Sequence, residues 1–261
     1  MHLGGFLVLS ADWEVLRHKE VTLDRRQIKA SAQAFQARRS LFLFLLTFSL
    51  SLLIMRLFMD KSHATEEAIK LAREIEAVVF DVDGVLFPAE VTEGFYDALG
   101  NPIRIKTRSY TDGQGVSLLR AIGMRVAFVT NEKDEHARAI TGVVEKWNAL
   151  PSSEKTSGDG GWHKVSLYTG MGGAKKVAAA ELFLQEFGGS FDRCAAMGDD
   201  LVDIPLLGRV ALRAAPAQAE KAVRDTCHFV AQRDGGKGAI RDFANFILEA
   251  RGIDPTTLPP Q

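Results

Sequence analysis

The chain has 261 residues, of which 46% are hydrophobic and 25% charged, and its formal net charge is −1. This apolar fraction is that of a globular core and excludes collagen-like and wholly disordered chains, and the near-neutral charge argues against a protein that coats nucleic acid. Two cysteines are too few for a disulfide framework or a four-cysteine zinc site.

The first sixty residues differ from the rest in charge and hydropathy. Residues 1–61 carry nine Lys and Arg against five acidic residues, so the remainder is acidic on balance. Segment 41–58 is largely apolar and carries no charge except Arg56, and its length is near the lower limit of ~17 residues for a membrane-spanning helix. Two interpretations stay open: 41–58 anchors the protein to a membrane, or 1–58 is upstream sequence that does not fold with the rest. A buried core helix is the weaker third alternative.

We therefore divide the chain into an N-terminal extension, 1–61, and a domain, 62–261. Within the domain, strand-like and helix-like stretches alternate. Apolar runs predict strands at 77–82, 125–130, 164–169, 194–197, 210–212 and 228–230, and apolar spacing predicts helices at 116–122, 135–147, 175–187 and 240–250. Residues 148–163 are expected to form a loop. The alternation predicts an α/β fold, a doubly wound parallel sheet that binds its ligand at the carboxyl ends of the strands.

Charged and polar residues follow several of these strands. The first strand ends in Asp81-Val82-Asp83-Gly84, a spacing that suits a carboxylate nucleophile with an acid/base partner, although an isolated pair of this kind is more often a turn or a helix cap. The second strand ends in Thr130-Asn131, and a pair of lysines opens the helix at 175. The fourth strand ends in Gly198-Asp199-Asp200, with Asp203 three residues further on.

These four motifs, in this order, resemble the haloacid-dehalogenase-like phosphohydrolase superfamily over about residues 76–250. The resemblance implies that Asp81 is the nucleophile and Asp83 the general acid/base. It implies a Mg²⁺ ion held by Asp81, Asp199 and the backbone carbonyl of Asp83. The residues expected to bind the phosphoryl group are Gly84, Thr130, Asn131 and Lys175. Lys176 is the alternative to Lys175, which we prefer because it keeps Glu181 and Leu182 in register with the family's helix.

The acid at position 83 limits which of the superfamily's reactions the chain is expected to catalyse. Dehalogenases of this superfamily generally lack an acid there and its ion-pumping ATPases carry threonine, whereas phosphatases and phosphomutases keep the aspartate. Only 49 positions separate Asp81 from Thr130, which leaves no room for a large cap domain. We expect a β-hairpin flap within 85–108, turning at Gly100-Asn101.

The domain is similar, more closely, to the family of 3-deoxy-D-manno-octulosonate 8-phosphate phosphatases. The stretches that carry this similarity are 79–86, Asp112-Gly113-Gln114-Gly115 (expected as a turn that opens a helix), 198–203 and 235–241. The family implies a homotetramer. Its glycine-rich segment, here 235–238, reaches into a neighbouring subunit; the alternative is a plain loop before the last helix. The family usually has arginine where this chain has Thr111, and Gly-Arg where it has Asn131-Glu132.

We expect Glu132 to repel an acidic substrate if it faces the site, with Lys133 as a substitute cation. The resemblance implies a cytoplasmic, magnesium-dependent phosphomonoesterase acting on that sugar phosphate or a related acidic keto-sugar phosphate. Its partners would be the sugar phosphate and other copies of itself, with no nucleic acid, and with membrane contact only if 41–58 is an anchor. The alternatives are a phosphatase of another sugar phosphate or of a nucleotide, and a non-catalytic, membrane-tethered module of the same fold.

Overall fold

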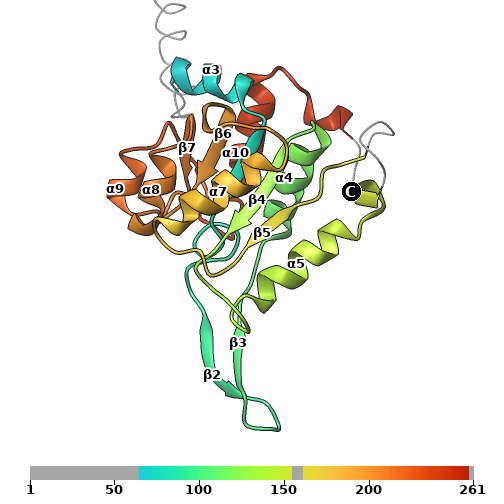
Figure 1. The fold of residues 1–261 in the computed structure, drawn as a ribbon, viewed down its shortest axis with the longest axis vertical. Coiled ribbons are helices and arrows are strands. Elements are labelled where there is room, and N and C mark those ends of the chain that lie inside the picture. Colours follow the sequence, from blue (N-terminus) through green and yellow to red (C-terminus); the bar gives the residue numbers. More distant parts are fainter. Residues whose placement is uncertain (1–64, 155–160, 259–261) are drawn as a thin grey trace, which may run out of the picture. The chain divides into compact units, whose positions relative to one another are not determined.

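The computed structural model describes residues 65–154 and 161–258, which belong to one unit, 63–261. Its centre is a six-stranded parallel sheet in the order β5-β4-β1-β6-β7-β8 (Figure 1). The strands are β1 (Ala77–Phe80), β4 (Arg125–Val129), β5 (Ser166–Tyr168), β6 (Cys194–Met197), β7 (Leu212–Ala215) and β8 (Phe229–Val230). The predicted doubly wound α/β fold is confirmed. Of the strand predictions, 194–197 matches β6 residue for residue, and 210–212 begins two residues before β7 and overlaps it only at Leu212.

The central strand β1 explains why helices cover both faces of the sheet. All four of its residues are fully buried. Val78 and Phe80 pack into one hydrophobic cluster and Ala77 and Val79 into the other. Successive side chains of a strand point to opposite faces, so a strand that is apolar at every position needs an apolar layer on each side.

Two helical layers supply those surfaces. Residues of α3 (Glu66–Glu74), α4 (Tyr110–Ala121), α5 (Arg138–Asn148) and α10 (Ala239–Ala250) line the first cluster. Residues of α7 (Lys175–Gln185), α8 (Ile204–Leu207) and α9 (Lys221–Arg224) line the second. The expected loop at 148–163 contains one further helical turn, α6 (Pro151–Glu154). It is fixed by Ser153, whose hydroxyl donates to the carbonyl of Trp147 at 2.8 Å.

The start of α4 differs from the prediction, because Asp112-Gly113-Gln114-Gly115 lies inside this helix and not in a turn before it. The fully buried Asp112 carboxylate accepts hydrogen bonds from the N–H groups of Gly238 and Ile240, both at 2.9 Å, and so caps the first turn of α10. Burial raises the pKa of Asp112 to about 6. At Gly115 a Cβ atom would lie 2.8 Å from the Cα atom of Arg241, so glycine lets α4 and α10 pack backbone to backbone.

The predicted flap is present as a two-stranded antiparallel hairpin, β2 (Thr92–Tyr96) and β3 (Pro102–Ile105), which extends away from the sheet (Figure 1). Its turn is closed by Asp97, whose Oδ1 accepts from the N–H groups of Leu99 and Asn101, both at 2.8 Å, and by Gly100 with φ of +82°. Between β1 and β4 the chain adds only this hairpin and α4, which agrees with the prediction of no large cap domain.

Residues 1–64 lie outside the described part of the chain, and with them the apolar segment 41–58 and the expected boundary at 61. Among residues 65–154 and 161–258, no helix is long and apolar enough to cross a membrane.

Candidate active site

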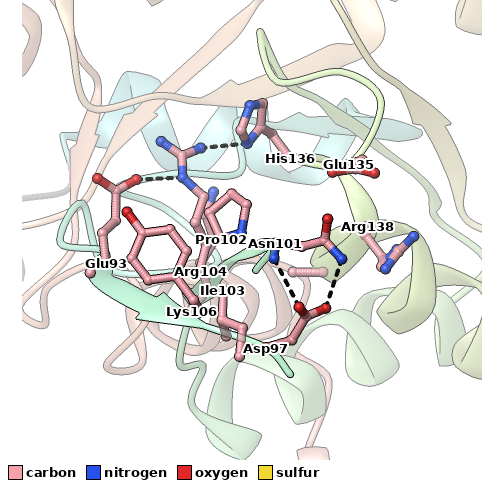
Figure 2. Close-up of a pocket in the computed structure, with 13 residues that line it drawn as sticks. Glu93, Asp97, Asn101, Pro102, Ile103, Arg104, Lys106, Glu135, His136 and Arg138 are labelled. Carbon is pink, nitrogen blue, oxygen red and sulfur yellow. Dashed lines mark hydrogen bonds and ion pairs between the residues drawn. The ribbon is translucent and has the colours of Figure 1, made fainter. Parts of the chain in front are cut away.

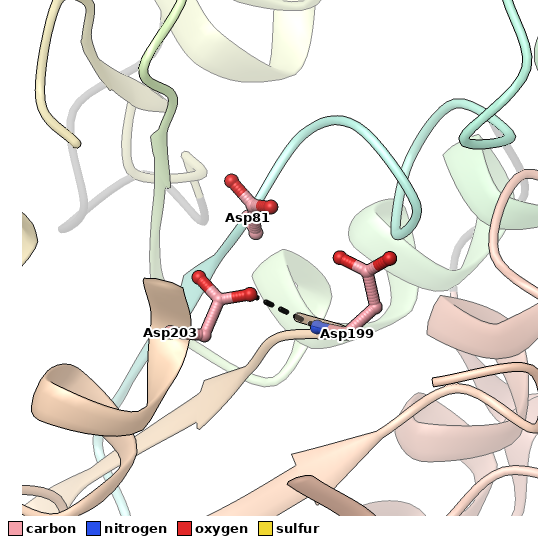
Figure 3. Close-up of side chains that lie close together, drawn as sticks. All are labelled: Asp81, Asp199 and Asp203. Atoms are coloured by element: carbon pink, nitrogen blue, oxygen red, sulfur yellow. Dashed lines mark hydrogen bonds between the residues drawn. The ribbon is translucent and has the colours of Figure 1, made fainter. Parts of the chain in front are cut away.

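The predicted site residues meet at the carboxyl edge of the sheet. Asp81 directly follows β1, Thr130 directly follows β4, and Asp199 is the second residue after β6. β4 and β6 are the two neighbours of β1, so the parallel sheet brings these positions to one place. Figure 3 shows Asp81 and Asp199 close together, with Asp203 beside them. One oxygen of each of these three carboxylates lies within 4.8 Å of the others.

Asp81 is buried, and its partner is a lysine. Its Oδ1 lies 2.6 Å from Nζ of Lys176, and its N–H donates to the carbonyl of Met197 at 3.0 Å. Burial, followed by the negative charge of Asp203, raises the pKa of Asp81, and the positive charge of Lys176 opposes that rise.

The structure corrects the choice between the two lysines. Lys175 lies on the exposed side of α7, whereas the side chain of Lys176 is only 2% exposed and contacts both Asp81 and Asp203. Consecutive residues of an α-helix point about 100° apart, so only one lysine of a neighbouring pair can face the site. The prediction that Lys175 faces the site is therefore wrong, because α7 packs on the sheet with Lys176 pointing inward.

Asp203 is the site residue whose role the sequence did not indicate. Its Oδ1 accepts from Lys176 at 2.5 Å, and its Oδ2 accepts from the N–H groups of Asp199 at 3.0 Å and Asp200 at 3.2 Å. Asp203 thus orients the lysine and holds the turn that carries Asp199. The one feature of the sequence that pointed to Asp203 was its position at the end of the 198–203 motif. Asp200, which is exposed, accepts from the N–H of Leu201 at 2.6 Å.

The donor set of this cluster fits a hard divalent cation. Lys176 pairs with two of the three carboxylates, those of Asp81 and Asp203. Burial, together with Asp203 and Asp200, raises the pKa of the third, Asp199, to about 7. Such an excess of buried negative charge is stabilised by a cation with oxygen ligands. Both oxygens of Asp203 already accept hydrogen bonds, so Asp81 and Asp199 are the side chains better placed to bind a metal ion.

Gly84 allows the catalytic loop, residues 81–87, to approach Asp199. Its φ is +82°, and a Cβ atom at this position would lie 1.9 Å from Oδ2 of Asp199. Gln218 fixes the same loop, because its Nε2 donates to the carbonyl of Gly84 at 2.7 Å and its Oε1 accepts from the N–H of Gly235 at 2.8 Å.

The glycine-rich segment 235–238 packs against the catalytic loop of its own chain. The N–H of Gly236 donates to the carbonyl of Val85 at 2.8 Å, and a Cβ atom on Gly235 would lie 1.8 Å from the carbonyl oxygen of Gly84. Within its own chain the segment is thus a loop before α10 that packs on residues 84–88, and its reach into a neighbouring subunit stays a prediction.

Thr130 and Asn131 lie where β4 meets the loop before α7. Thr130 is buried, its Oγ1 accepts from the N–H of Glu132 at 3.1 Å, and its carbonyl accepts from the N–H of Met171 at 2.8 Å. Asn131 is exposed, and its amide oxygen lies so close to Gly172 that a Cβ atom there would be 2.4 Å away. The loop before α7 is therefore held against the strand end that carries both residues.

Asp83 belongs to a second charged group on the side of the hairpin. Lys106 follows β3 directly, and its Nζ lies 2.5 Å from Oδ1 of Asp83 and 2.5 Å from Oε2 of Glu132. Arg104 also approaches Glu132, at 3.7 Å. The negative charge expected to repel an acidic substrate is thus compensated by two cations of the hairpin, whereas Lys133 is exposed.

An open cleft of about 700 Å³ begins at Lys106 and extends between the hairpin and the start of α5 (Figure 2). Its lining carries Arg104, His136 and Arg138 together with the acids Glu93, Asp97 and Glu135. Arg104 is hydrogen-bonded to Glu93, and its Nη1 lies 2.7 Å from Nδ1 of His136.

Comparisons with known proteins agree with this geometry. A family model described as haloacid dehalogenase-like hydrolase matches residues 134–240. The 3-deoxy-D-manno-octulosonate 8-phosphate phosphatase KdsC of Escherichia coli K12 is 27% identical over 189 residues, which cover 71% of this chain and 86% of KdsC.

Solved structures give the same result. The cobalt-bound deoxy-D-mannose-octulosonate 8-phosphate phosphatase of Haemophilus influenzae is 27% identical with a TM-score of 0.54, and the match covers 70% of this chain and 92% of that one. A hypothetical protein of Xanthomonas campestris is 30% identical with a TM-score of 0.55, over 72% of this chain and 89% of that one. On the strength of the sheet order, the strand-end aspartates and these similarities, the chain belongs to the haloacid dehalogenase-like hydrolases and is a hydrolase of phosphoric monoesters.

Proposed function

We propose that the protein is a magnesium-dependent phosphatase that acts through an aspartyl-phosphate on Asp81. The observation that carries the proposal is the pairing of a buried carboxylate at the end of the central strand with a buried lysine, beside a second, unneutralised carboxylate at Asp199. A buried nucleophile among compensating charges is the arrangement that attack on a phosphate dianion requires, since the two anions otherwise repel each other.

In the first half-reaction an oxygen of Asp81 forms a bond to phosphorus as the bond from phosphorus to the leaving oxygen breaks. Lys176 compensates negative charge beside Asp81, and the Thr130 hydroxyl donates a hydrogen bond to a phosphoryl oxygen. Asp83 gives a proton to the leaving alkoxide. In the second half-reaction it takes a proton from the water that attacks phosphorus, the bond from phosphorus to the Asp81 oxygen breaks, phosphate leaves, and both aspartates return to their starting states. A Mg²⁺ ion held by Asp81, Asp199 and the carbonyl of Asp83 would supply further positive charge at the phosphoryl group.

For the substrate we propose an acidic sugar phosphate, 3-deoxy-D-manno-octulosonate 8-phosphate or a related keto-sugar phosphate. The cleft supports this class because it adjoins Asp83 through Lys106 and its lining offers both cations and hydrogen-bond acceptors, which suit a carboxylate and several hydroxyl groups. The Escherichia coli and Haemophilus influenzae relatives are phosphatases of such a sugar phosphate. A homotetramer acting in the cytoplasm remains part of the proposal.

The test is phosphate release by the full chain from a panel that contains acidic sugar phosphates, neutral sugar phosphates and nucleotides, each with Mg²⁺ and with EDTA. We expect magnesium-dependent turnover, fastest with the acidic sugar phosphates. Faster turnover of neutral sugar phosphates or nucleotides would contradict the substrate class. A lack of turnover on the whole panel with Mg²⁺ would contradict the proposed activity.

A further inference from the structure

Lys106 connects the hairpin to the catalytic loop. It is the residue directly after β3, and its side chain is only 7% exposed although the strands of the hairpin are exposed throughout. Its Nζ lies 2.5 Å from a carboxylate oxygen of Asp83, and also 5.7 Å from the centre of the Phe87 ring in the same loop. Lys106 therefore contacts the catalytic loop at two places, Asp83 and Phe87.

A second carboxylate holds Lys106 in place. Glu132, two residues after Thr130, accepts from the same Nζ at 2.5 Å, so the lysine is bound by one acid from the loop after β1 and one from the loop after β4. A lysine in contact with a single exposed acid loses much of its interaction energy to side-chain freedom. Two acids and an aromatic ring restrict that freedom, and they fix the direction from which the ammonium group meets Asp83.

We propose that Lys106 is a positioning residue for the reaction, which holds the Asp83 carboxylate toward the leaving oxygen of the substrate and is itself oriented by Glu132. This inference rests on the proposed function, because it takes Asp83 as the group that protonates the leaving alkoxide. The hairpin then contributes to the reaction in two ways: it lines the cleft, and Lys106 at the end of β3 positions Asp83. A displacement of β3 would therefore move Lys106 relative to Asp83.

The proposal predicts a dependence on the leaving group. An alkoxide from a sugar is strongly basic and needs a proton as it departs, and a correctly placed acid contributes about 10²–10⁴ to such a step. The 4-nitrophenolate ion is a weak base and departs without that proton. The parameter kcat/KM reports the steps up to departure of the leaving group, so hydrolysis of the aspartyl-phosphate does not affect the comparison.

The test therefore compares kcat/KM for the best sugar phosphate and for 4-nitrophenyl phosphate in the full chain and in Lys106→Met. We expect a loss of tenfold or more with the sugar phosphate and of less than about threefold with the aryl phosphate. Lys106→Arg, which keeps a cationic donor, should recover part of the loss. Lys221→Met is the matched control: it removes an exposed lysine whose ion pair, with Asp225, includes no residue of the site, and both substrates should react at the parental rate.

A double-mutant comparison shows whether Lys106 acts through Asp83. In the Asp83→Asn background, Lys106→Met should cause no further loss with the sugar phosphate if the lysine acts through Asp83. An equal loss on both substrates, or a loss of the same size in the Asp83→Asn background, would overturn the proposal, because the lysine would then act on the substrate or on the fold as a whole. Unchanged kinetics in Lys106→Met would overturn it too. Inactivity of the parent chain on every substrate would instead contradict the proposed function.

Discussion

At the scale of single residues, the adjacent lysines of α7 offer the sharpest comparison. Lys176 is buried against Asp81 and Asp203, and Lys175 is exposed one position earlier. Lys176→Met removes the positive charge beside the attacking oxygen, so we expect kcat/KM to fall by about 10³ or more, a barrier increase of at least ~4 kcal/mol. Lys175→Met should stay within about threefold of the parent. Steady-state phosphatase assays measure kcat/KM of both variants. A larger loss in Lys175→Met than in Lys176→Met would contradict the position of Lys176 in the site.

The two aspartates after β6 form a second matched pair. Asp199 lies in the acidic cluster, whereas Asp200 points to solvent and caps Leu201. Asp199→Asn removes an expected metal ligand, so the Mg²⁺ concentration for half-maximal activity should rise by tenfold or more and kcat should fall. Asp200→Asn should shift that concentration by less than about threefold. The reverse order in magnesium titrations would show that Asp199 is not the ligand.

The raised pKa values in the cluster predict how pH affects stability. Asp199 titrates near pH 7 in the folded, metal-free protein against 3.8 for an ordinary aspartate, and the pKa of Asp81 is raised as well. Between these values the folded state holds more protons than the unfolded state, so the free energy of unfolding decreases as pH rises from about 4 to about 7. A bound cation replaces those protons.

The melting temperature in EDTA should therefore fall between pH 5 and pH 8, and the gain on adding Mg²⁺ should be larger at pH 8. Asp199→Asn removes one of the titrating groups, so the gain from Mg²⁺ should differ less between pH 5 and pH 8 in this variant. Differential scanning fluorimetry of the two proteins at both pH values provides the measurement. A magnesium gain that is equal at the two pH values, or larger at pH 5, would contradict the account of the cluster.

At the scale of elements, the contact between α4 and α10 depends on glycine. Alanine is normally the better helix former by about 1 kcal/mol. In Gly115→Ala, however, the new methyl group would lie 2.8 Å from the Cα atom of Arg241, so the two helices must separate. We expect a loss of about 1–3 kcal/mol in the free energy of unfolding.

Gly142 is the control for this substitution. It lies inside α5, where a Cβ atom would meet no atom within 4 Å, so Gly142→Ala should stabilise the protein by about 0.5–1 kcal/mol. Urea denaturation of both variants measures the difference. If Gly115→Ala were also stabilising, α4 and α10 would not be in the close contact that the structure shows.

The elements that could be predicted from the sequence are those formed by residues close together in the chain. The buried strands β1 and β6 follow from short apolar runs, and the hairpin turn follows from Gly100-Asn101. The start of α4 could not be predicted in the same way. Asp112 and its glycines have the composition of a turn, but the partner of Asp112 is the first turn of α10, more than 120 residues later.

At the scale of the whole molecule, the strand order explains which parts of the site were predictable. Motifs that follow β1, β4 and β6 must meet, because those strands are neighbours in a parallel sheet. The apolar runs placed Asp81, Thr130 and Asp199 at strand ends, and the resemblance to the superfamily placed them in one site. The inward rotation of Lys176 and the bridge from Lys106 to Asp83 depend on how helix and hairpin pack, and no local pattern in the sequence encodes those contacts.

The central claim is that Asp81 becomes phosphorylated during turnover, and it can be measured directly. The full chain is mixed with substrate and Mg²⁺, quenched with acid within the first turnovers and treated with borohydride, which reduces an aspartyl-phosphate to homoserine. Peptide mass spectrometry then locates the converted residue. We predict homoserine at position 81, dependent on substrate and absent from Asp81→Asn. Conversion at another aspartate, or continued turnover by Asp81→Asn without conversion at residue 81, would contradict the account.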